Sequence, residues 1–324
     1  MSSDPLDVSV VICVYTEERW PQLVEAIESV KSQTRLPRET IVAVDHNPKL
    51  LARLGESVTG IRLVDSVGPK GKSGALNSAI DVASGSIIAM LDDDAAAEPT
   101  WLEELHAGYV DPLVLGVGGH LEPHWSSPRP RWFPDEFLWV FGCTFRGMPT
   151  RRQAVRSVIG ANMSFRREVF VQAGGSRAGL GPDGTELTGA ARAEDTEFCL
   201  RASAKWPDRV WIYEPRARVR HHVPPARATW SYFRTRCYVE GVSKAVIAHV
   251  AGTRSLRMER QYTFRTLTSG VLIGIGRGMW KRDLGEFARA AAIVAGFSIT
   301  ATGYLRETVR LRRAAMHREH PAAT

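Results

Sequence analysis

Three consecutive carboxylates, Asp92-Asp93-Asp94, come directly after the short apolar run of residues 87–91. A run this short and this apolar is typical of a strand that is buried on both faces. Unpaired buried carboxylates cost roughly several kcal/mol each, so we expect these acids at the carboxyl end of the strand, where open α/β sheets bind ligands. Oxygen ligands crowded together select a hard divalent cation such as Mg²⁺ or Mn²⁺, usually shared with a substrate phosphate. A solvated acidic turn is the alternative that this stretch alone leaves open.

A glycine-rich loop at residues 68–74 precedes that strand, and it falls one glycine short of a phosphate-binding P-loop. This suggests a P-loop-like nucleotide hydrolase as an alternative. In such an enzyme Gly71, Lys72 and Ser73 would contact the phosphates and Asp92 would hold magnesium. Two or three strands precede the loop, and only one short helix separates it from Asp92, which argues against that fold.

The elements that must position these groups follow an α/β order. Residues 8–14, 40–44, 61–64 and 87–91 are predicted strands, because they are short and rich in β-branched or other apolar residues. Apolar residues recur at helical spacing over residues 20–30 and 75–83, which predicts two helices. This order favours a mostly parallel central sheet with flanking helices. Asp45 and Asp92 would then lie on the same edge of the sheet.

The second half of the chain has a different texture. Residues 100–109 are a predicted helix, and residues 113–121, 159–165 and 210–213 are predicted strands. Aromatic residues gather in the proline-rich stretch 125–141, where they form either a satellite core or one wall of a substrate cleft. The glycine-rich residues 174–189 predict a mobile loop, and it leads into a helix that begins near Glu194 and Asp195, where the macrodipole favours acids.

The bulk composition narrows the class of partner. The chain has 324 residues, 44% of them apolar, and a formal net charge of +7. A basic balance predicts an anionic partner: a nucleotide, a nucleic acid or a membrane surface. The basic residues concentrate after residue 200 without a recognised nucleic-acid-binding motif, so a nucleic-acid-binding protein is only a second alternative and we expect no nucleic acid. The absence of CxxC pairs and of a signal-peptide pattern favours a reducing, cytoplasmic location.

From about residue 226 the chain becomes helical and rich in arginine. We therefore expect an α/β domain at residues 1–225 and a C-terminal helical appendage at residues 226–324. Two apolar stretches, 267–280 and 290–305, are each shorter than the roughly 20 residues that span a bilayer. Arginines flank both, which is typical of helices that lie in a membrane interface. Peripheral contact with the inner face of the cell membrane is expected, with packing on the protein's own surface as the alternative.

Several short motifs, in their order and spacing, resemble those of the family 2 glycosyltransferases, whose catalytic domain has the nucleotide-sugar-binding fold called GT-A. The resemblance covers about residues 8–245, and it rests on Val10-Val11-Ile12-Cys13-Val14-Tyr15-Thr16-Glu17, Val44-Asp45, Gly71-Lys72-Ser73-Gly74-Ala75-Leu76-Asn77, Asp92-Asp93-Asp94, Gly160-Ala161-Asn162-Met163-Ser164, Glu194-Asp195 and Val219-Arg220-His221. It implies a GT-A catalytic domain and an inverting transfer of a sugar from a nucleotide diphosphate to an acceptor, with Mg²⁺ or Mn²⁺ as cofactor.

Carried over by position, the resemblance also implies roles for individual residues. The nucleotide sugar would be bound by Cys13, Tyr15, Thr16, Glu17, Asp45, Lys72, Asn77, Asp92 and Asp93. The metal would be held by Asp94, Asp92 and His221, with His221 preferred over its neighbour His222. The catalytic base would be Asp195, supported by Glu194. The acceptor side would comprise Gly160, Ala161, Asn162 and Trp230.

Chemical reasoning is consistent with these roles. A nucleotide diphosphate leaves with developing negative charge, which a divalent cation stabilises. The acceptor hydroxyl has a high pKa, so a carboxylate must take its proton as the bond forms. At a helix start the pKa of Asp195 should rise little, which keeps the base ionised at neutral pH. Read without the family order, Glu194 and Asp195 would be ordinary acids at a helix start.

The sequence departs from the family pattern at Cys13 and Thr16, where many relatives have Pro and Asn, and at His46, which replaces a frequent second acid. We expect a UDP-linked donor. The Gln-x-x-Arg-Trp motif of processive polysaccharide synthases is absent after Asp195, which favours single transfer over polymerisation. The expected acceptor is a hydroxyl or phosphate of a saccharide, a lipid-linked substrate or a small molecule.

Overall fold

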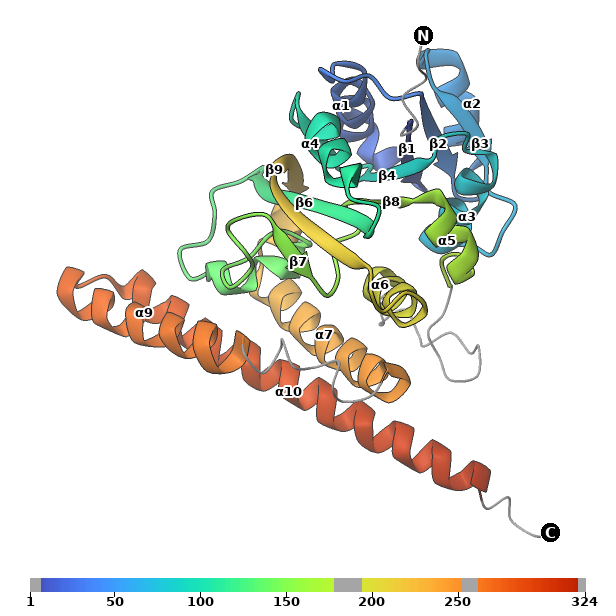
Figure 1. Cartoon of the computed structure of the whole chain (residues 1–324). Helices are drawn as coiled ribbons and strands as arrows, with labels where there is room; N and C mark the ends of the chain where they lie inside the picture. Colours follow the sequence, from blue (N-terminus) through green and yellow to red (C-terminus); the bar gives the residue numbers. More distant parts are fainter. Residues whose placement is uncertain (1–6, 178–193, 252–261, 320–324) are drawn as a thin grey trace.

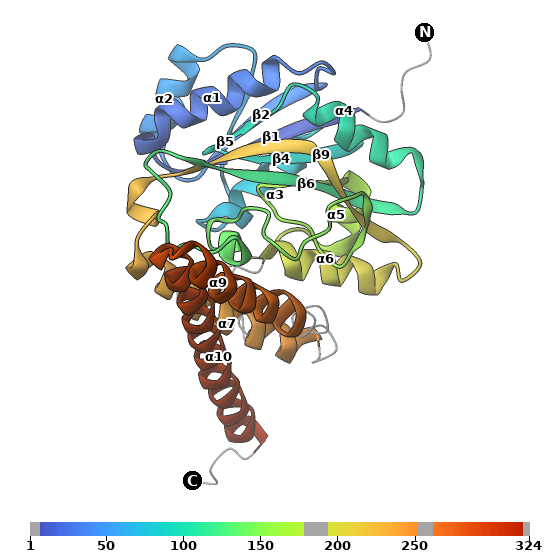
Figure 2. The same cartoon turned by 90° about the vertical axis from the view of Figure 1, so that its left-hand side faces the viewer.

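A mixed sheet of nine strands runs through the protein in the order β3-β2-β1-β4-β8-β6-β9-β5, with β7 paired to β9. The computed structural model describes residues 7–177, 194–251 and 262–319, so most of the expected loop at 174–189 lies outside the described residues. Helices cover both faces of the sheet, and three more helices lie below it (Figures 1 and 2).

Strands β1 to β4 form a continuous parallel part of the sheet. They are β1 (Val8–Val14), β2 (Glu39–Val44), β3 (Arg62–Asp65) and β4 (Ile87–Asp92). Strand β1 lies between β2 and β4 and runs parallel to both. Alternate side chains enter two separate cores: Val10 and Ile12 enter one, whereas Val11 enters the other. This two-sided burial explains why these strands are continuous apolar runs.

The rest of the sheet adds antiparallel strands, so the sheet is mixed. Strand β8 (Asn162–Arg166) is antiparallel to both β4 and β6 (Val114–Trp125). Strands β5 (Ala95–Ala97) and β7 (Gln153–Val155) are antiparallel to the long β9 (Val210–Val223), which runs parallel to β6. Sequence patterns predict β6, β8 and the start of β9 but not the three-residue strands β5 and β7, and a strand's direction depends on which neighbour it pairs with.

Two layers of helix enclose the sheet (Figure 2). One layer contains α1 (Trp20–Lys31), α2 (Pro48–Ser57) and α4 (Trp101–His106). The other contains α3 (Lys72–Val82), α5 (Arg167–Ala173) and α6 (Glu194–Lys205). Helix α2 was not among the expected elements, although its start is well marked: Pro48 is the first helical residue, and Asn47 Oδ1 accepts a hydrogen bond from the Leu50 N–H over 3.1 Å.

The proline-rich aromatic stretch belongs to the core. It contains the 3₁₀ helix η3 (Asp135–Phe141), whose Phe137 and Phe141 are buried. Phe133 and Phe137 each lie within 5.5 Å of the Phe233 ring, measured between centroids. Since Phe233 belongs to the helix that follows the sheet, the C-terminal helices share the core of the α/β domain. The proposed boundary at residue 225 is untested and stays a prediction.

The C-terminal region consists of α7 (Trp230–Ala251), the short π-helix η6 (Tyr262–Leu267), α9 (Thr268–Lys281) and α10 (Leu284–Glu319). Helices α7 and α10 touch at backbone level, because a Cβ at Gly303 would lie 2.3 Å from the Tyr238 carbonyl oxygen. The apolar residues 290–305 lie within α10, so the helix that contains them is far longer than the apolar stretch itself. Among the described helices, α10 alone is long and apolar enough, over Leu284–Ala314, to cross a membrane.

Candidate active site

The register of three parallel strands brings the expected donor-side residues to one edge of the sheet. Cys13 on β1 is paired with Asp92 on β4, and Val14 is paired with Val44 on β2. The strands therefore end level with one another, and Tyr15 and Asp45 follow at the same edge. The carboxylate of Asp45 is already engaged: Oδ1 lies 2.8 Å from His46 Nδ1, and Oδ2 accepts a hydrogen bond from the Gly71 N–H over 2.9 Å.

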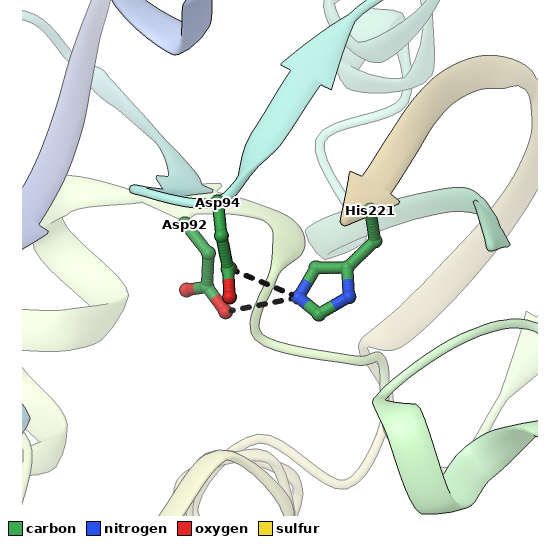
Figure 3. Close-up of side chains that lie close together, drawn as sticks. All are labelled: Asp92, Asp94 and His221. Atoms are coloured by element: carbon green, nitrogen blue, oxygen red, sulfur yellow. Dashed lines mark ion pairs between the residues drawn. The ribbon is translucent and has the colours of Figure 1, made fainter. Parts of the chain in front are cut away.

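A histidine from β9 lies beside the three aspartates Asp92-Asp93-Asp94, which we call the acidic turn. Strand β5 pairs Ala95 with His221 on β9, and the His222 N–H donates to the Asp94 carbonyl oxygen over 2.8 Å. This pairing aims His221 Nε2 at both carboxylates, 3.2 Å from Asp94 Oδ1 and 3.9 Å from Asp92 Oδ2 (Figure 3). His222 points elsewhere, with its ring against Ser126 Oγ.

These three side chains have the composition of a divalent-metal site. One ligand atom from each of Asp92, Asp94 and His221 lies within 4.8 Å of the others. Asp94 and His221 are buried. Two carboxylate oxygens and one imidazole nitrogen suit a borderline cation such as Mn²⁺ and also accommodate Mg²⁺. The residues present therefore fit a divalent cation.

Basic side chains surround the acids. Lys72, the first residue of α3, donates from Nζ to Asp92 Oδ1 over 2.7 Å. Arg19 Nη1 donates to Asp93 Oδ1 over 2.8 Å and lies 3.2 Å from Asp94 Oδ2. Arg19 and Arg227, which also pairs with Asp94, were not expected from the sequence. Each ends a three-residue 3₁₀ helix, which is too short for a periodic pattern to mark it out.

The charges in the turn perturb one another. Burial disfavours the charged form of each group, but ion pairing with His221, Arg19 and Arg227 still holds the pKa of Asp94 well below its usual range. Burial and the neighbouring aspartates outweigh Arg19 at Asp93 and raise the pKa of that carboxyl to about 6. Burial lowers the pKa of His221, but its interactions with Asp94 and Cys143 together outweigh burial and raise the pKa to about 10. The site therefore holds an acidic cluster together with tightly bound positive charge.

Asp195 faces this cluster from the start of α6. Its Oδ2 accepts a hydrogen bond from the Gly160 N–H over 3.1 Å. Burial raises the pKa of Asp195, and although Lys72 opposes the shift, the nearby Glu194 and Asp92 add to it, giving about 6. This exceeds the small rise expected from the sequence, because Asp195 is partly buried in the cleft beside two other carboxylates. The carboxylate is nevertheless mostly ionised at neutral pH.

One cleft of about 1700 Å³ is lined both by Asp92-Asp93-Asp94 and by Glu194-Asp195. Most of the expected site residues line it: Cys13, Tyr15, Asp45, Lys72, Asp92, Asp93, Asp94, Ala161, Glu194, Asp195 and His221. The cleft continues past them between α7, η6 and α10, where Tyr232, Arg236, Lys244 and Phe264 contribute to its wall. Phe137, Trp139 and Phe141 line it as well, so the aromatic stretch is both core and cleft wall.

Six expected site residues do not line the cleft, and the structure gives most of them other contacts. The wholly buried Asn162 accepts from Trp101 Nε1 and donates to the carbonyl oxygens of His120 and Ala217. Asn77 is bonded to the backbone of Ser176. Thr16 accepts the Glu18 N–H, and Trp230 packs on Trp132 and Phe233. Glu17 lies beside Thr16 in η1 (Glu17–Arg19), and Gly160 supports Asp195 through its backbone.

Comparison with known proteins agrees with this geometry. Residues 9–173 match the family model described as Glycosyl transferase family 2. The glucosyl-dolichyl phosphate glucuronosyltransferase of Haloferax volcanii is 34% identical over 246 residues, which are 75% of this chain and 77% of that protein. The succinoglycan biosynthesis protein ExoM of Rhizobium meliloti is 23% identical over 257 residues, 74% of this chain and 75% of its own.

Two solved structures share the fold. The mannosyltransferase PcManGT of Pyrobaculum calidifontis, in complex with GDP-Man and Mn²⁺, has a TM-score of 0.54 at 19% identity, over 94% of this chain and 89% of its own. GalNAc-T7 with UDP, GalNAc and Mn²⁺ has a TM-score of 0.52 at 15% identity, over 81% of this chain. The match spans 55% of the GalNAc-T7 chain. Both are GT-A structures, so the mixed sheet with its flanking helices is a GT-A fold.

Proposed function

The chain belongs to glycosyltransferase family 2, and on that basis we propose that it transfers a single sugar, with inversion, from a UDP-linked donor to a lipid-linked acceptor at a membrane surface. That the enzyme is a glycosyltransferase using a nucleotide-sugar donor follows from the family. One observation carries the finer proposal: Asp195 lines the same cleft as the Asp92–Asp94–His221 cluster, so a base and a diphosphate site lie within one cavity.

On the donor side, the proposed binding surface runs from Tyr15 to the acidic turn. Tyr15 is 54% exposed at the cleft edge, where its ring offers a face for a nucleobase. Asp45, Cys13 and Lys72 line the stretch between that ring and Asp92. The proposal of uridine rests on the family resemblance.

Asp92, Asp94 and His221 are the proposed metal ligands. A divalent cation bound there would supply positive charge for the diphosphate leaving group. We propose Mn²⁺ in preference to Mg²⁺, because an imidazole ligand suits the softer ion better. Lys72 would hold Asp92 in orientation through its hydrogen bond of 2.7 Å.

Asp195 is the proposed general base. It would accept the proton of the acceptor hydroxyl as that oxygen attacks the anomeric carbon, while the bond from that carbon to the diphosphate breaks on the opposite side. Attack from the face opposite the leaving group inverts the anomeric configuration. The Gly160 N–H fixes the carboxylate, and Glu194 favours a raised pKa that keeps it basic near neutrality.

The acceptor proposal rests on the far part of the cleft and on the named relative. The H. volcanii protein is named for action on glucosyl-dolichyl phosphate, a lipid-linked sugar. In this chain the cleft reaches α7, η6 and α10, and exposed apolar side chains gather on η6, α10 and the intervening α9: Phe264, Leu272, Met279, Trp280, Leu284 and Leu305. Such a surface suits the membrane interface, and an acceptor anchored in lipid would reach the cleft from there.

The test is product analysis with purified enzyme. Sugar donors on UDP and GDP, including UDP-glucuronic acid, are offered with Mn²⁺ to a polyprenyl-phosphate-linked sugar and to a water-soluble sugar. We expect transfer from a UDP donor to the lipid-linked acceptor, with one sugar added and the anomeric configuration inverted by NMR. Retention of configuration would refute the role of Asp195, and transfer only to soluble sugars would refute the lipid-linked acceptor.

A further inference from the structure

Asp94 is the most heavily paired carboxylate of the acidic turn. Its Oδ1 lies 3.2 Å from His221 Nε2, and its Oδ2 lies 3.2 Å from Arg19 and 3.4 Å from Arg227. Three basic side chains therefore converge on one proposed metal ligand. His221 is itself a proposed ligand, but a divalent cation that binds Asp94 must compete with the two arginines, because like charges this close repel one another strongly in a partly desolvated site.

The two arginines are held differently. Arg19 has a second anchor, a hydrogen bond of 2.8 Å to Asp93 Oδ1. Asp93 is buried, and its other oxygen has no hydrogen-bond partner in the part of the chain that the structure describes, so loss of Arg19 would leave that carboxylate unpaired. Over the described residues, Arg227 forms an ion pair with Asp94 and with no second carboxylate. Arg227 can therefore leave Asp94 without exposing another buried charge.

The position of Arg227 determines where it would go. It ends the short 3₁₀ helix η4 (Pro225–Arg227) that joins β9 to α7, and its side chain is 20% exposed where it lines the cleft. A guanidinium released from Asp94 stays in the cleft beside the acidic turn. An anion with several oxygens is the partner that its planar fork binds best.

We propose that Arg227 is an exchange residue: it neutralises Asp94 in the empty enzyme and moves to the diphosphate of the donor when metal and nucleotide bind. The inference rests on the proposed function, since it assumes a nucleotide-diphosphate donor. It assigns Arg227 two opposite effects. The residue competes with the metal when no nucleotide is present, and it supports binding of the nucleotide diphosphate once the metal is bound.

Because Arg227 should weaken metal binding but strengthen nucleotide binding, its loss should change the two affinities in opposite directions, which a purely structural role would not do. Mn²⁺ binding to the full-length protein without nucleotide is measured by electron paramagnetic resonance, and UDP and GDP binding at saturating Mn²⁺ by calorimetry. In Arg227→Gln we expect Mn²⁺ alone to bind at least about threefold more tightly, and the preferred nucleotide to bind about tenfold more weakly. Arg227→Lys keeps the charge and should lie between Arg227→Gln and wild type in both measurements.

Arg220→Gln is the matched control. It also removes one positive charge, but Arg220, on β9, is not among the residues that line the cleft, and it pairs with Glu98 over 3.3 Å and with Glu25 over 3.6 Å. Both affinities should stay within about twofold of wild type, because an exposed ion pair contributes little. Melting curves check that each variant is folded, and Arg227→Lys carries the test if Arg227→Gln is not.

Three results would overturn the exchange. Arg227→Gln could weaken both affinities, which would make Arg227 a structural support of the site. It could leave Mn²⁺ affinity unchanged, so that no competition exists, or leave nucleotide affinity unchanged, so that no transfer to the diphosphate exists. Failure of the wild-type protein to bind Mn²⁺, UDP and GDP would instead refute the proposed function on which the exchange rests.

Discussion

The carboxylate of Asp195 lies directly against the backbone of Gly160. Asp195 Oδ2 accepts the Gly160 N–H over 3.1 Å, and a Cβ built on residue 160 would lie only 2.0 Å from the same oxygen. No side chain fits there unless Asp195 moves. The glycine is therefore required for a close approach between backbone and acid, not for an unusual backbone conformation.

Gly160→Ala should displace the Asp195 carboxylate. General-base catalysis contributes a factor of about 10²–10⁴, so we expect kcat to fall by at least about tenfold while nucleotide affinity changes little. Steady-state kinetics and nucleotide binding together test this. Gly276→Ala on α9 is the control, because nothing lies within 4 Å of a Cβ there. An unchanged kcat in Gly160→Ala would remove the argument for Asp195.

The pH profile should report the raised pKa of Asp195, which is about 6. The ionised form is the base, so protonation below that pH removes activity. We expect kcat/KM to be flat above about pH 7 and to fall tenfold per unit below about pH 6, whereas an ordinary aspartate would give a break near pH 4. Asp195→Asn should be slow and lack this break.

Asp93 also has a pKa of about 6 and must be separated from Asp195. Because Asp93 pairs with Arg19 and is not a proposed base, Asp93→Asn should keep the break in the profile near pH 6. Loss of that break in Asp93→Asn, with its persistence in Asp195→Asn, would reverse the two assignments.

Removing the imidazole ligand should weaken metal binding. His221→Gln is expected to lower Mn²⁺ affinity by at least about tenfold, as measured by metal titration of activity and by direct binding. His222→Gln is a matched control, since its ring contacts Ser126 on the other side of β9. Full activity of wild-type enzyme in excess chelator would contradict the metal site as a whole.

Asn162→Ala should cost stability. Its buried amide accepts a hydrogen bond from Trp101 Nε1 and donates to two carbonyl oxygens. Each of these groups that is left unsatisfied costs about 1–3 kcal/mol. We expect the free energy of unfolding to fall by about 2–4 kcal/mol in denaturant titration. Asn77→Ala, at a half-buried site, should cost less. A stable Asn162→Ala protein with weakened acceptor binding would restore the original assignment to the acceptor side.

The turn between α9 and α10 should bind membranes. Met279, Trp280 and Leu284 are 68%, 88% and 82% exposed there, next to Lys281 and Arg282. Buried apolar side chains contribute roughly 1.5–3 kcal/mol each, so replacing the three by serine should lower binding to anionic vesicles at least about tenfold in flotation. Leu36→Ser with Val171→Ser removes exposed apolar groups elsewhere and should have no effect. Equal binding by both variants would argue against this surface.

The sequence predicts those parts of the structure that depend on local pattern. The strands at Val8–Val14 and Ile87–Asp92 stand out because both of their faces are buried, and the acids that follow them fall at the sheet edge for the same reason. The family order then identifies the enzyme class. That class replaces the two alternatives, a P-loop-like hydrolase and a nucleic-acid-binding protein, with a glycosyltransferase.

Features that depend on distant partners escaped prediction. Asn162 follows Gly160 and Ala161 in one motif, yet its amide is turned into the core by Trp101 and Ala217, which nothing in the local sequence signals. Arg227 can be recognised as a site residue only from the folded chain, which places it 3.4 Å from Asp94. The direction of β8 and the raised pKa of Asp195 likewise depend on neighbours that only the folded chain supplies.

The three-residue strand β5 has a consequence for how the protein is made. Its pairing with β9 is what carries His221 to Asp94, although the two residues come from opposite halves of the chain. A ribosome that has released only the first 173 residues has made the whole segment matched by the family model, with all three aspartates but without His221 or Arg227. In a chain of that length, Lys72 and Arg19 are the basic residues already made that pair with the acidic turn in the folded protein. The proposed metal site can therefore be completed only after β9 has been made and has paired with β5.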